Sequence, residues 1–222
     1  RFPHVLRQGY PWSGHARLGG MPRWALPTVR FLESLSYAMA RRIVVTSEAQ
    51  RREAGGCAAG GTAAGGRRLW GGRIRVVPNA VSPAVPAAEA ARDGGGSLRV
   101  LFVGRLTMQK RLDRLLEALA GEPGFRLAVA GDGPLRGEWE EQARRLGVRA
   151  SFLGRLPHDR VLREMAASDI YVLCSDFEGH PKTLLEAMAA GLPVVATDLA
   201  CVRETVRDGG TGIVAPPDPP PG

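Results

Sequence analysis

The sequence has 222 residues, 44% of them hydrophobic, which is enough for one or two domains with an ample core. Its three cysteines show no CxxC or Cys/His spacing, which argues against a structural zinc site and favours a reducing compartment. The formal net charge of +8 favours anionic partners, but the scattered arginines form no basic run and no known nucleic-acid-binding module, so no nucleic acid is expected as a partner.

No apolar run approaches the roughly 20 residues of a membrane-spanning helix, and no signal peptide is recognisable. We therefore expect a cytoplasmic protein. Its positive charge permits peripheral contact with the inner face of a membrane.

The first 77 residues predict a small, partial α/β unit. The expected elements are a short strand at 4–7, a helix at 27–41, a buried strand at 43–46, a short helix at 47–53 and a strand at 73–77. In the helix at 27–41, four residues at helical spacing lie on one side: Val29, Leu32, Leu35 and Ser36.

Two segments of low complexity follow. Residues 55–72 alternate glycine pairs with alanine and cannot bury enough surface to offset their ordering entropy, which predicts a mobile loop. Residues 78–97 are typical of a linker between this unit and the next.

From residue 98 to 218 the pattern becomes regular. Strands are expected at 98–103, 125–130, 150–153, 170–173 and 193–196, and helices at 112–119, 135–146, 160–167 and from Pro181. The first strand is apolar apart from Arg99, as in a strand buried on both faces, and the first helix repeats leucine at i, i+3, i+4 and i+7. The alternation predicts βαβ crossovers and a doubly wound parallel sheet, followed by a Pro-rich tail at 219–222.

The stretch SDFEGHPKTLLEAMAAG at 175–191 is the centre of the predicted site. A strand ends, a turn follows, and a helix opens at Pro181, so unpaired helix N–H groups face the carboxyl edge of the sheet, where anions bind. Lys182 lies in the first helical turn, where a cation is better tolerated with an anion nearby. Glu178 and Glu186 stand on either side, so a sugar nucleotide could use all of these groups.

Two other turns add candidate residues. Gly104 allows a sharp turn after the strand at 98–103, and Arg105 and Lys110 on the same loop could clamp a diphosphate or simply be solvated charges. Gly131 and Gly133 follow the next strand. A dinucleotide fingerprint would need a third glycine at Arg136, so an NAD site is not expected, and a tight turn explains these glycines at least as well as ligand contact.

The run from Glu178 to Glu186 resembles the E-x7-E signature of retaining family-4 glycosyltransferases. Four further motifs match the family in order, so that the resemblance covers residues 73–218: VVPN at 76–79, VGRLTMQK at 103–110, GDGP at 131–134 and VAPPD at 214–218.

The resemblance implies a GT-B fold with a Rossmann-like nucleotide-sugar domain at 98–218. It implies that residues 1–77 are the closing section of an acceptor-side domain that is incomplete at its N-terminus. The implied reaction is that of a retaining hexosyltransferase, which moves a sugar from a nucleoside-diphosphate donor to a glycan or lipid-linked acceptor without a metal or other cofactor.

The resemblance also assigns roles to residues of the site. It implies that Arg105 and Lys110 contact the diphosphate, Glu178 lies against the donor sugar, and Glu186 accepts hydrogen bonds from the ribose hydroxyls. His180 either donates to a phosphate or sugar oxygen or fills the turn. Backbone N–H groups are expected to face the diphosphate from Gly179, Lys182, Thr183 and Leu184.

Two alternatives stay open at this level. The chain could bind the nucleotide without catalysis, because most of the acceptor side would be missing. It could also be a GT-B phosphorylase or epimerase that acts on related substrates.

Overall fold

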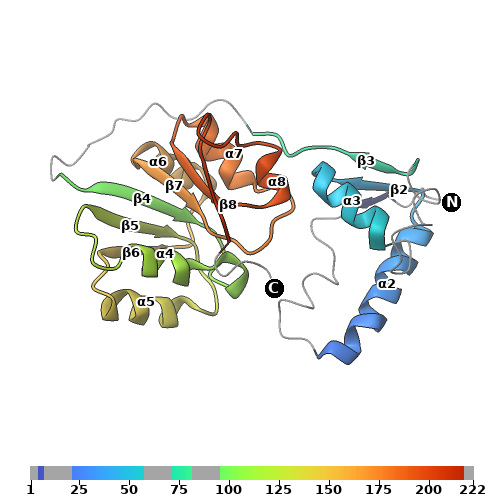
Figure 1. Ribbon diagram of the computed structural model, residues 1–222, viewed down its shortest axis with the longest axis horizontal. Coiled ribbons are helices and arrows are strands. Elements are labelled where there is room, and N and C mark those ends of the chain that lie inside the picture. Colours follow the sequence, from blue (N-terminus) through green and yellow to red (C-terminus); the bar gives the residue numbers. More distant parts are fainter. Residues whose placement is uncertain (1–4, 8–21, 58–71, 82–95, 218–222) are drawn as a thin grey trace. The chain divides into compact units, whose positions relative to one another are not determined.

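The computed structural model describes residues 5–7, 22–57, 72–81 and 96–217 (Figure 1). By their contacts the residues divide into two units, one of Arg1–Asn79 with Glu178–His180 and one of Ala80–Phe177 with Pro181–Gly222. The expected mobile loop and linker lie mostly outside the described residues, and the tail at 219–222 lies entirely outside them.

The described part of the first unit contains a parallel three-stranded sheet in the order β1-β2-β3. The central strand contributes Ile43 and Val45 to the core, each 1% exposed. Helix α3 continues past the expected end at Glu53 into the Gly/Ala-rich run. The elements are β1 (Val5–Arg7), η1 (Arg23–Ala25), α2 (Leu26–Met39), β2 (Arg42–Val45), α3 (Glu48–Cys57) and β3 (Ile74–Val76).

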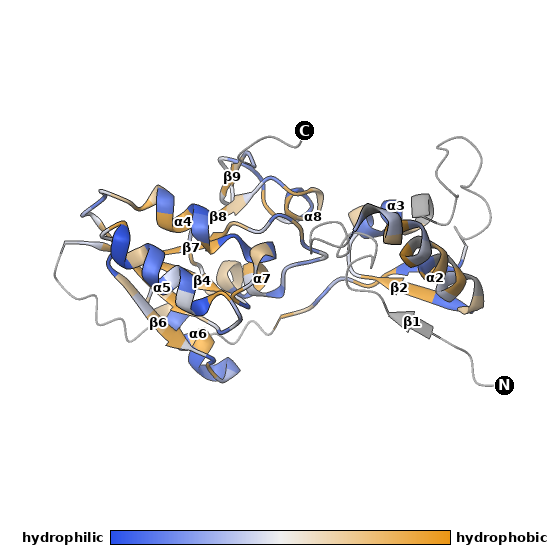
Figure 2. Cartoon of the chain, turned by 90° about the horizontal axis from the view of Figure 1, so that it is seen from below, coloured by the Kyte–Doolittle hydropathy of each residue, from blue (hydrophilic) through white to orange (hydrophobic). Residues whose placement is uncertain are grey.

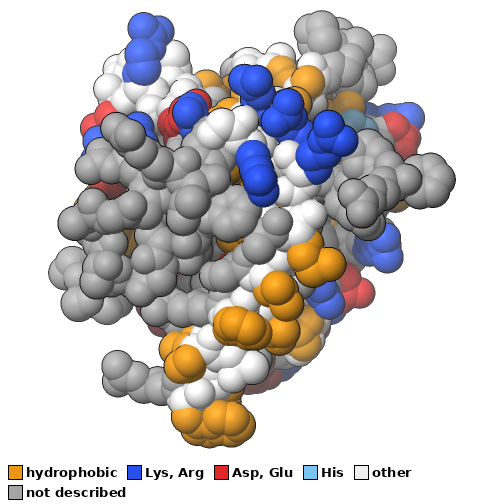
Figure 3. Space-filling model, turned by 90° about the vertical axis from the view of Figure 1, so that its right-hand side faces the viewer, with side chains coloured by type: hydrophobic (Ala, Val, Ile, Leu, Met, Phe, Trp, Pro, Cys, Tyr) orange, Lys and Arg blue, Asp and Glu red, His pale blue; other side chains and the backbone are white. Residues whose placement is uncertain are grey.

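The helix α2 buries a different side from the one expected. Its core side consists of Glu33, Tyr37 and the capping Ala40, because Tyr37 and Ala40 pack with the strand residues of β2. Leu32 and Leu35 lie on the exposed side of the helix. Figure 3 shows a strip of apolar side chains on the face turned to the viewer, with basic side chains beyond its upper end. The exposed apolar residues of η1 and α2 are Trp24, Phe31, Leu32, Leu35 and Met39.

Within residues 96–217 the second unit forms a parallel six-stranded sheet in the order β6-β5-β4-β7-β8-β9. Its strands are β4 (Leu98–Val103), β5 (Phe125–Ala130), β6 (Ala150–Gly154), β7 (Ile170–Leu173), β8 (Val194–Thr197) and β9 (Ile213–Ala215). Its helices are η3 (Met108–Lys110), α4 (Leu112–Ala118), α5 (Arg136–Arg145), α6 (His158–Ala166), α7 (Lys182–Ala189) and α8 (Ala200–Arg203). The order reverses between β4 and β7, and this switch point is where doubly wound sheets bind ligands.

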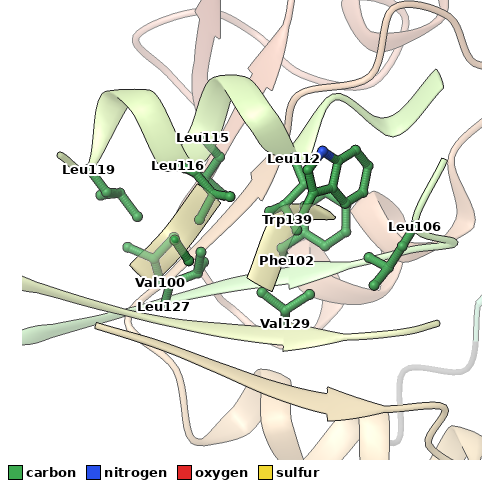
Figure 4. Close-up of a cluster of buried hydrophobic side chains, with 11 residues drawn as sticks. Val100, Phe102, Leu106, Leu112, Leu115, Leu116, Leu119, Leu127, Val129 and Trp139 are labelled. Atoms are coloured by element: carbon green, nitrogen blue, oxygen red, sulfur yellow. The ribbon is translucent and has the colours of Figure 1, made fainter. Parts of the chain in front are cut away.

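The core on one face of this sheet is built where α4 and α5 cover β4 and β5 (Figure 4). Phe102 of β4 and Trp139 of α5 are among its largest members, and both are at most 2% exposed. The alternate residues of β4 and β5 are buried as well, so both faces of these strands are covered after Arg99 and Arg126. Figure 2 shows hydrophobic strands at the centre of this unit. The predicted leucine face of α4 packs into the same core, with Leu112, Leu115, Leu116 and Leu119.

Three elements of the second unit are not among those expected from the sequence, and the first is the single 3-10 turn η3 before α4. The short helix α8 and the edge strand β9 follow β8, and β9 pairs with β8 through Val195–Ile213 to Thr197–Ala215. Helix α6 begins at His158, two residues before the expected start.

Candidate functional site

Loops from three strands meet at the carboxyl edge of the six-stranded sheet. The loop after β4 is tied to the loop after β5 by the N–H of Gly104, which donates to Ala130 O at 3.0 Å, and by the N–H of Leu106, which donates to Asp132 O at 3.0 Å. The turn after β7 is tied to the loop after β4 by the N–H of Asp176, which donates to Gln109 O at 2.9 Å. The loops that carry the expected diphosphate residues are therefore backbone-linked neighbours.

The glycines of the second turn are required by this packing. Gly131 has φ +148°, and a Cβ there would lie 1.8 Å from Gly104 O. A Cβ on Gly133 would lie 2.4 Å from Leu106 O. No side chain fits at either position, so the fold itself explains both glycines. Their contact with a ligand stays a prediction.

A pocket of about 820 Å³ opens between these loops and the end of β6. Its volume lies in the range typical of small-molecule sites. Arg105 and Arg155 both line it, and two arginines on one pocket suit an anionic ligand with several oxygen acceptors. The other lining residues are Val103, Gly104, Ala130, Gly131, Asp132, Gly133, Pro134, Leu156 and Val161.

Sequence reasoning missed Arg155. The residue directly follows β6, and the carboxyl ends of parallel strands meet at one edge of the sheet. Its position directly after a predicted strand was the signal that could have indicated a site residue. Its neighbouring residues form no motif that distinguishes it from the many other arginines.

Lys110 lies across Gly104. The Cδ and Cε atoms of Lys110 are 3.4 Å from the place that a Cβ on Gly104 would occupy. Gly104 therefore makes room for the lysine stem next to the pocket, beyond its expected role in the turn. The Lys110 carbonyl accepts a hydrogen bond from Cys174 Sγ at 3.2 Å.

Cys174 is held as a neutral thiol. Burial, followed by the nearby Asp113 carboxylate, raises its pKa to about 12. A thiolate is the nucleophilic form of cysteine, so this residue supports the Lys110 loop as a small hydrogen-bond donor rather than as a reactive group.

Glu186 of α7 is 5% exposed and has two cationic or donor neighbours. Its Oε1 lies 2.8 Å from His158 Nε2 and 3.5 Å from Lys182 Nζ. Nothing in the sequence pairs His158 with Glu186, which lies 28 positions away, so this contact is a finding of the structure. The Glu186 carboxylate also supplies an anion near Lys182, which weakens the argument that this lysine requires a bound phosphate.

The start of α7 offers backbone donors. Thr183 Oγ1 lies 2.7 Å from Tyr171 OH, and Leu184 is fully buried, so both side chains are used within the fold. Pro181 caps the helix without a side-chain hydrogen bond. The first N–H groups of a helix have no intrahelical partner and attract anions. That Lys182, Thr183 and Leu184 present theirs to a diphosphate stays a prediction.

By its contacts, the turn Glu178–His180 belongs to the first unit. The N–H of Asn79 donates to His180 Nδ1 at 3.1 Å, and Asn79 Nδ2 donates to the His180 carbonyl at 2.7 Å. The ring of His180 is thus held within that unit through Asn79. The roles expected of Glu178, Gly179 and His180 toward a donor stay predictions.

Among the residues that the structure describes, no group of three or more His, Cys, Asp or Glu side chains is placed to hold a metal ion. Over the same residues, every helix is too short or too polar to cross a bilayer.

Comparison with known proteins adds independent information. The family described as "Glycosyl transferases group 1" matches residues 89–220, which is more than half of the chain. The chain is 34% identical over 150 residues to the glycogen synthase of Mycobacterium tuberculosis, covering 65% of this chain and 36% of that protein. It is 35% identical over 157 residues to the phosphatidyl-myo-inositol mannosyltransferase of the same species, covering 65% and 40%.

The fold agrees with this relationship. The crystal structure of Anabaena Alr3699/HepE in complex with UDP matches 97% of this chain and 59% of that chain, with a TM-score of 0.76 and 23% identity. Here too the chain spans less than two thirds of the protein it matches. The α/β architecture with its parallel six-stranded sheet is that of GT-B glycosyltransferases over part of their chains, and the chain belongs to the glycosyl transferases group 1 family.

Proposed function

We propose that the chain is the donor-binding part of a glycosyltransferase that transfers a hexose from a nucleoside-diphosphate sugar to an acceptor, with retention at the anomeric carbon. The observation that carries the proposal is the presence of Arg105 and Arg155 on one pocket at the carboxyl edge of the parallel sheet. Membership of the family supports the reaction type. The volume of about 820 Å³ supports a ligand of nucleotide-sugar size.

The proposed chemistry depends on charge stabilisation. The bond from the anomeric carbon to the diphosphate oxygen breaks, and negative charge gathers on the leaving diphosphate. The acceptor hydroxyl oxygen bonds to the anomeric carbon, and its proton passes to the leaving diphosphate. Arg105, Lys110 and the N–H groups at the start of α7 would stabilise that charge in place of a metal ion. Glu186 would accept hydrogen bonds from the ribose hydroxyls, and Glu178 would lie against the donor sugar.

For the acceptor we propose a glycan or a lipid-linked sugar. One relative is named a phosphatidyl-myo-inositol mannosyltransferase, which supports a lipid acceptor. The net charge of +8 supports peripheral contact with an anionic membrane surface. We place the reaction on the cytoplasmic side, where Cys174 and Cys201 would keep the free thiols seen in the structure.

A thermal-shift panel of UDP, GDP, ADP, their hexose conjugates and the free nucleosides tests the proposal. A ligand at 100 times its Kd stabilises the folded state by about 2.7 kcal/mol, so the preferred diphosphate should raise the Tm by several degrees. Arg105→Ala should remove this shift, whereas Arg145→Ala, an exposed arginine on α5, should keep it. The proposal is wrong if no diphosphate at millimolar concentration changes the Tm.

A second candidate is donor binding without turnover. It is favoured by the location of all the pocket-lining residues in the second unit and by the partial coverage of the relatives, 36% and 40% in the two named above. An assay that monitors the consumption of donor sugar by chromatography, with and without added saccharide or lipid acceptors, distinguishes a transferase from a binding protein. A diphosphate that shifts the Tm while no donor is consumed would favour binding alone.

A further inference from the structure

Arg111 has an unusual backbone conformation. Its φ of 48° and ψ of 44° put it in the left-handed region, and within the described ranges it is the only non-glycine residue with positive φ. Any residue with a Cβ pays a free-energy cost there, and glycine would not. Strained residues of this kind persist where the surroundings hold them, and they cluster at functional sites.

The side chain of Arg111 joins two carboxylates. Its Nη2 lies 2.8 Å from Asp113 Oδ2, and its Nε contacts the same carboxylate, so Asp113 orients the guanidinium. The remaining Nη1 forms an ion pair with Asp176 Oδ2 at 3.4 Å. Arg114 of α4 reaches Asp176 Oδ1 at 2.9 Å.

Burial strengthens this network. The side chains of Arg111, Asp113, Arg114 and Asp176 are each only a fifth to a quarter exposed. Partly buried ion pairs are screened less by salt and water than pairs on an open surface. Asp176 lies in the turn between β7 and α7, so the network fixes the start of α4 to that turn.

Gln109 fixes the same turn from the other side of Lys110. Its carbonyl accepts a hydrogen bond from the N–H of Asp176, and its Nε2 donates to the Phe177 carbonyl, both at 2.9 Å. Lys110 therefore lies between two residues, Gln109 and Arg111, that are each attached to the β7–α7 turn. The position of Lys110 next to Gly104 follows from both attachments.

We propose that Arg111 is a positioning residue for the binding of the donor diphosphate. Through its ion pair with Asp176, Arg111 holds Lys110 in place. This inference rests on the proposed function, because it requires Lys110 to bind the diphosphate. The left-handed backbone at Arg111 is explained by the need for a guanidinium at a point where the chain must also turn into α4. The ligand class is a nucleoside diphosphate.

The test compares Arg111→Gly with Asp176→Asn, measuring Tm and calorimetric affinity for the diphosphate preferred in the thermal-shift panel and for its nucleoside monophosphate. Arg111→Gly removes the ion pairs and also relieves the backbone, so its Tm should stay close to that of the unaltered chain. Affinity for the diphosphate should fall about tenfold, with a smaller loss for the monophosphate. Asp176→Asn should show the same selective loss without any backbone change, and Arg111→Lys should recover part of the affinity.

The Lys110→Ala background separates this inference from the proposed function. If Arg111 acts through Lys110, Arg111→Gly should change the affinity less than twofold once Lys110 is absent. A full additional loss in that background would overturn the inference, as would unchanged diphosphate affinity in both Arg111→Gly and Asp176→Asn. If Lys110→Ala itself leaves the affinity unchanged, the assigned role of Lys110 in the proposed function fails instead.

Discussion

His158 Nε2 lies 2.8 Å from Glu186 Oε1 and thereby joins the first residue of α6 to the middle of α7. Glu186 is almost completely buried, whereas the His158 side chain is 61% exposed. A buried carboxylate needs donors to offset its desolvation, and the structure supplies them from a histidine and a lysine.

Replacing His158 with alanine should lower the free energy of unfolding by about 1 kcal/mol, because Glu186 loses its shortest hydrogen bond. The exposure of His158 allows water to replace the imidazole, which keeps the loss at the lower end of the usual range. Urea denaturation measures the change, with Arg160→Ala, an exposed residue of the same helix, as the control. Equal stability of the two variants would contradict the role given to His158.

Glu186→Gln should reduce the preference for a ribose over a 2′-deoxyribose nucleotide by about tenfold, or about 1.4 kcal/mol, because a charged acceptor binds hydroxyls more strongly than a neutral amide does. Calorimetry with each ribonucleoside diphosphate and its 2′-deoxy analogue measures the ratio. A ratio equal to that of the unaltered chain would show that Glu186 does not contact the 2′-hydroxyl.

Gly131→Ala should destabilise the protein by about 3 kcal/mol or more, because its backbone is left-handed and the new methyl group would overlap the Gly104 carbonyl. Gly137→Ala on α5 is the matched control. A Cβ at Gly137 meets no atom within 4 Å, so this change should stabilise the helix by about 0.5 kcal/mol. Denaturant unfolding of both variants checks the pair, and similar midpoints would show that the packing of Gly131 is wrongly described.

Cys174 should make the stability depend on pH above neutrality. Its folded-state pKa is raised by burial to about 12 from 9.0, so the folded protein keeps the proton that the unfolded chain loses. This contribution is complete below pH 9 and declines as the pH rises toward 12, by up to about 1.4 kcal/mol per pH unit. Between pH 8 and 10.5 the free energy of unfolding should fall more steeply with pH for the unaltered chain than for Cys174→Ala. The same pH dependence in both proteins would mean that the pKa of the Cys174 thiol is not raised by folding.

The second unit was largely predictable because its elements are defined by local patterns. The bounds of β4 and β5 agree with the sequence prediction, since strands buried on both faces appear as apolar runs, here interrupted only by Arg99 and Arg126. The leucine face of α4 was equally clear. The edge strand β9 was missed because it has only three residues, Ile213–Ala215, between a glycine-rich turn and two prolines.

Other features depend on contacts that sequence spacing cannot show. Helix α2 has apolar residues on two sides, and its packing on β2 decides that Tyr37 is buried while Leu35 is exposed. His158 and Glu186 are 28 positions apart, and Arg155 reaches the pocket only because β6 ends at the same edge as β4 and β5. Local motifs predicted the residues of the candidate site, and the tertiary fold supplied the partners of those residues.

The most direct test of the central claim is the calorimetric affinity of a nucleoside diphosphate for the unaltered chain, Arg105→Ala, Lys110→Ala and the control Arg145→Ala. If cations at the carboxyl edge of the sheet hold the diphosphate, each of the first two changes should weaken binding by about 10- to 100-fold, and Arg145→Ala should not change it. Equal affinity in all four proteins would show that the diphosphate, if it binds, is held elsewhere.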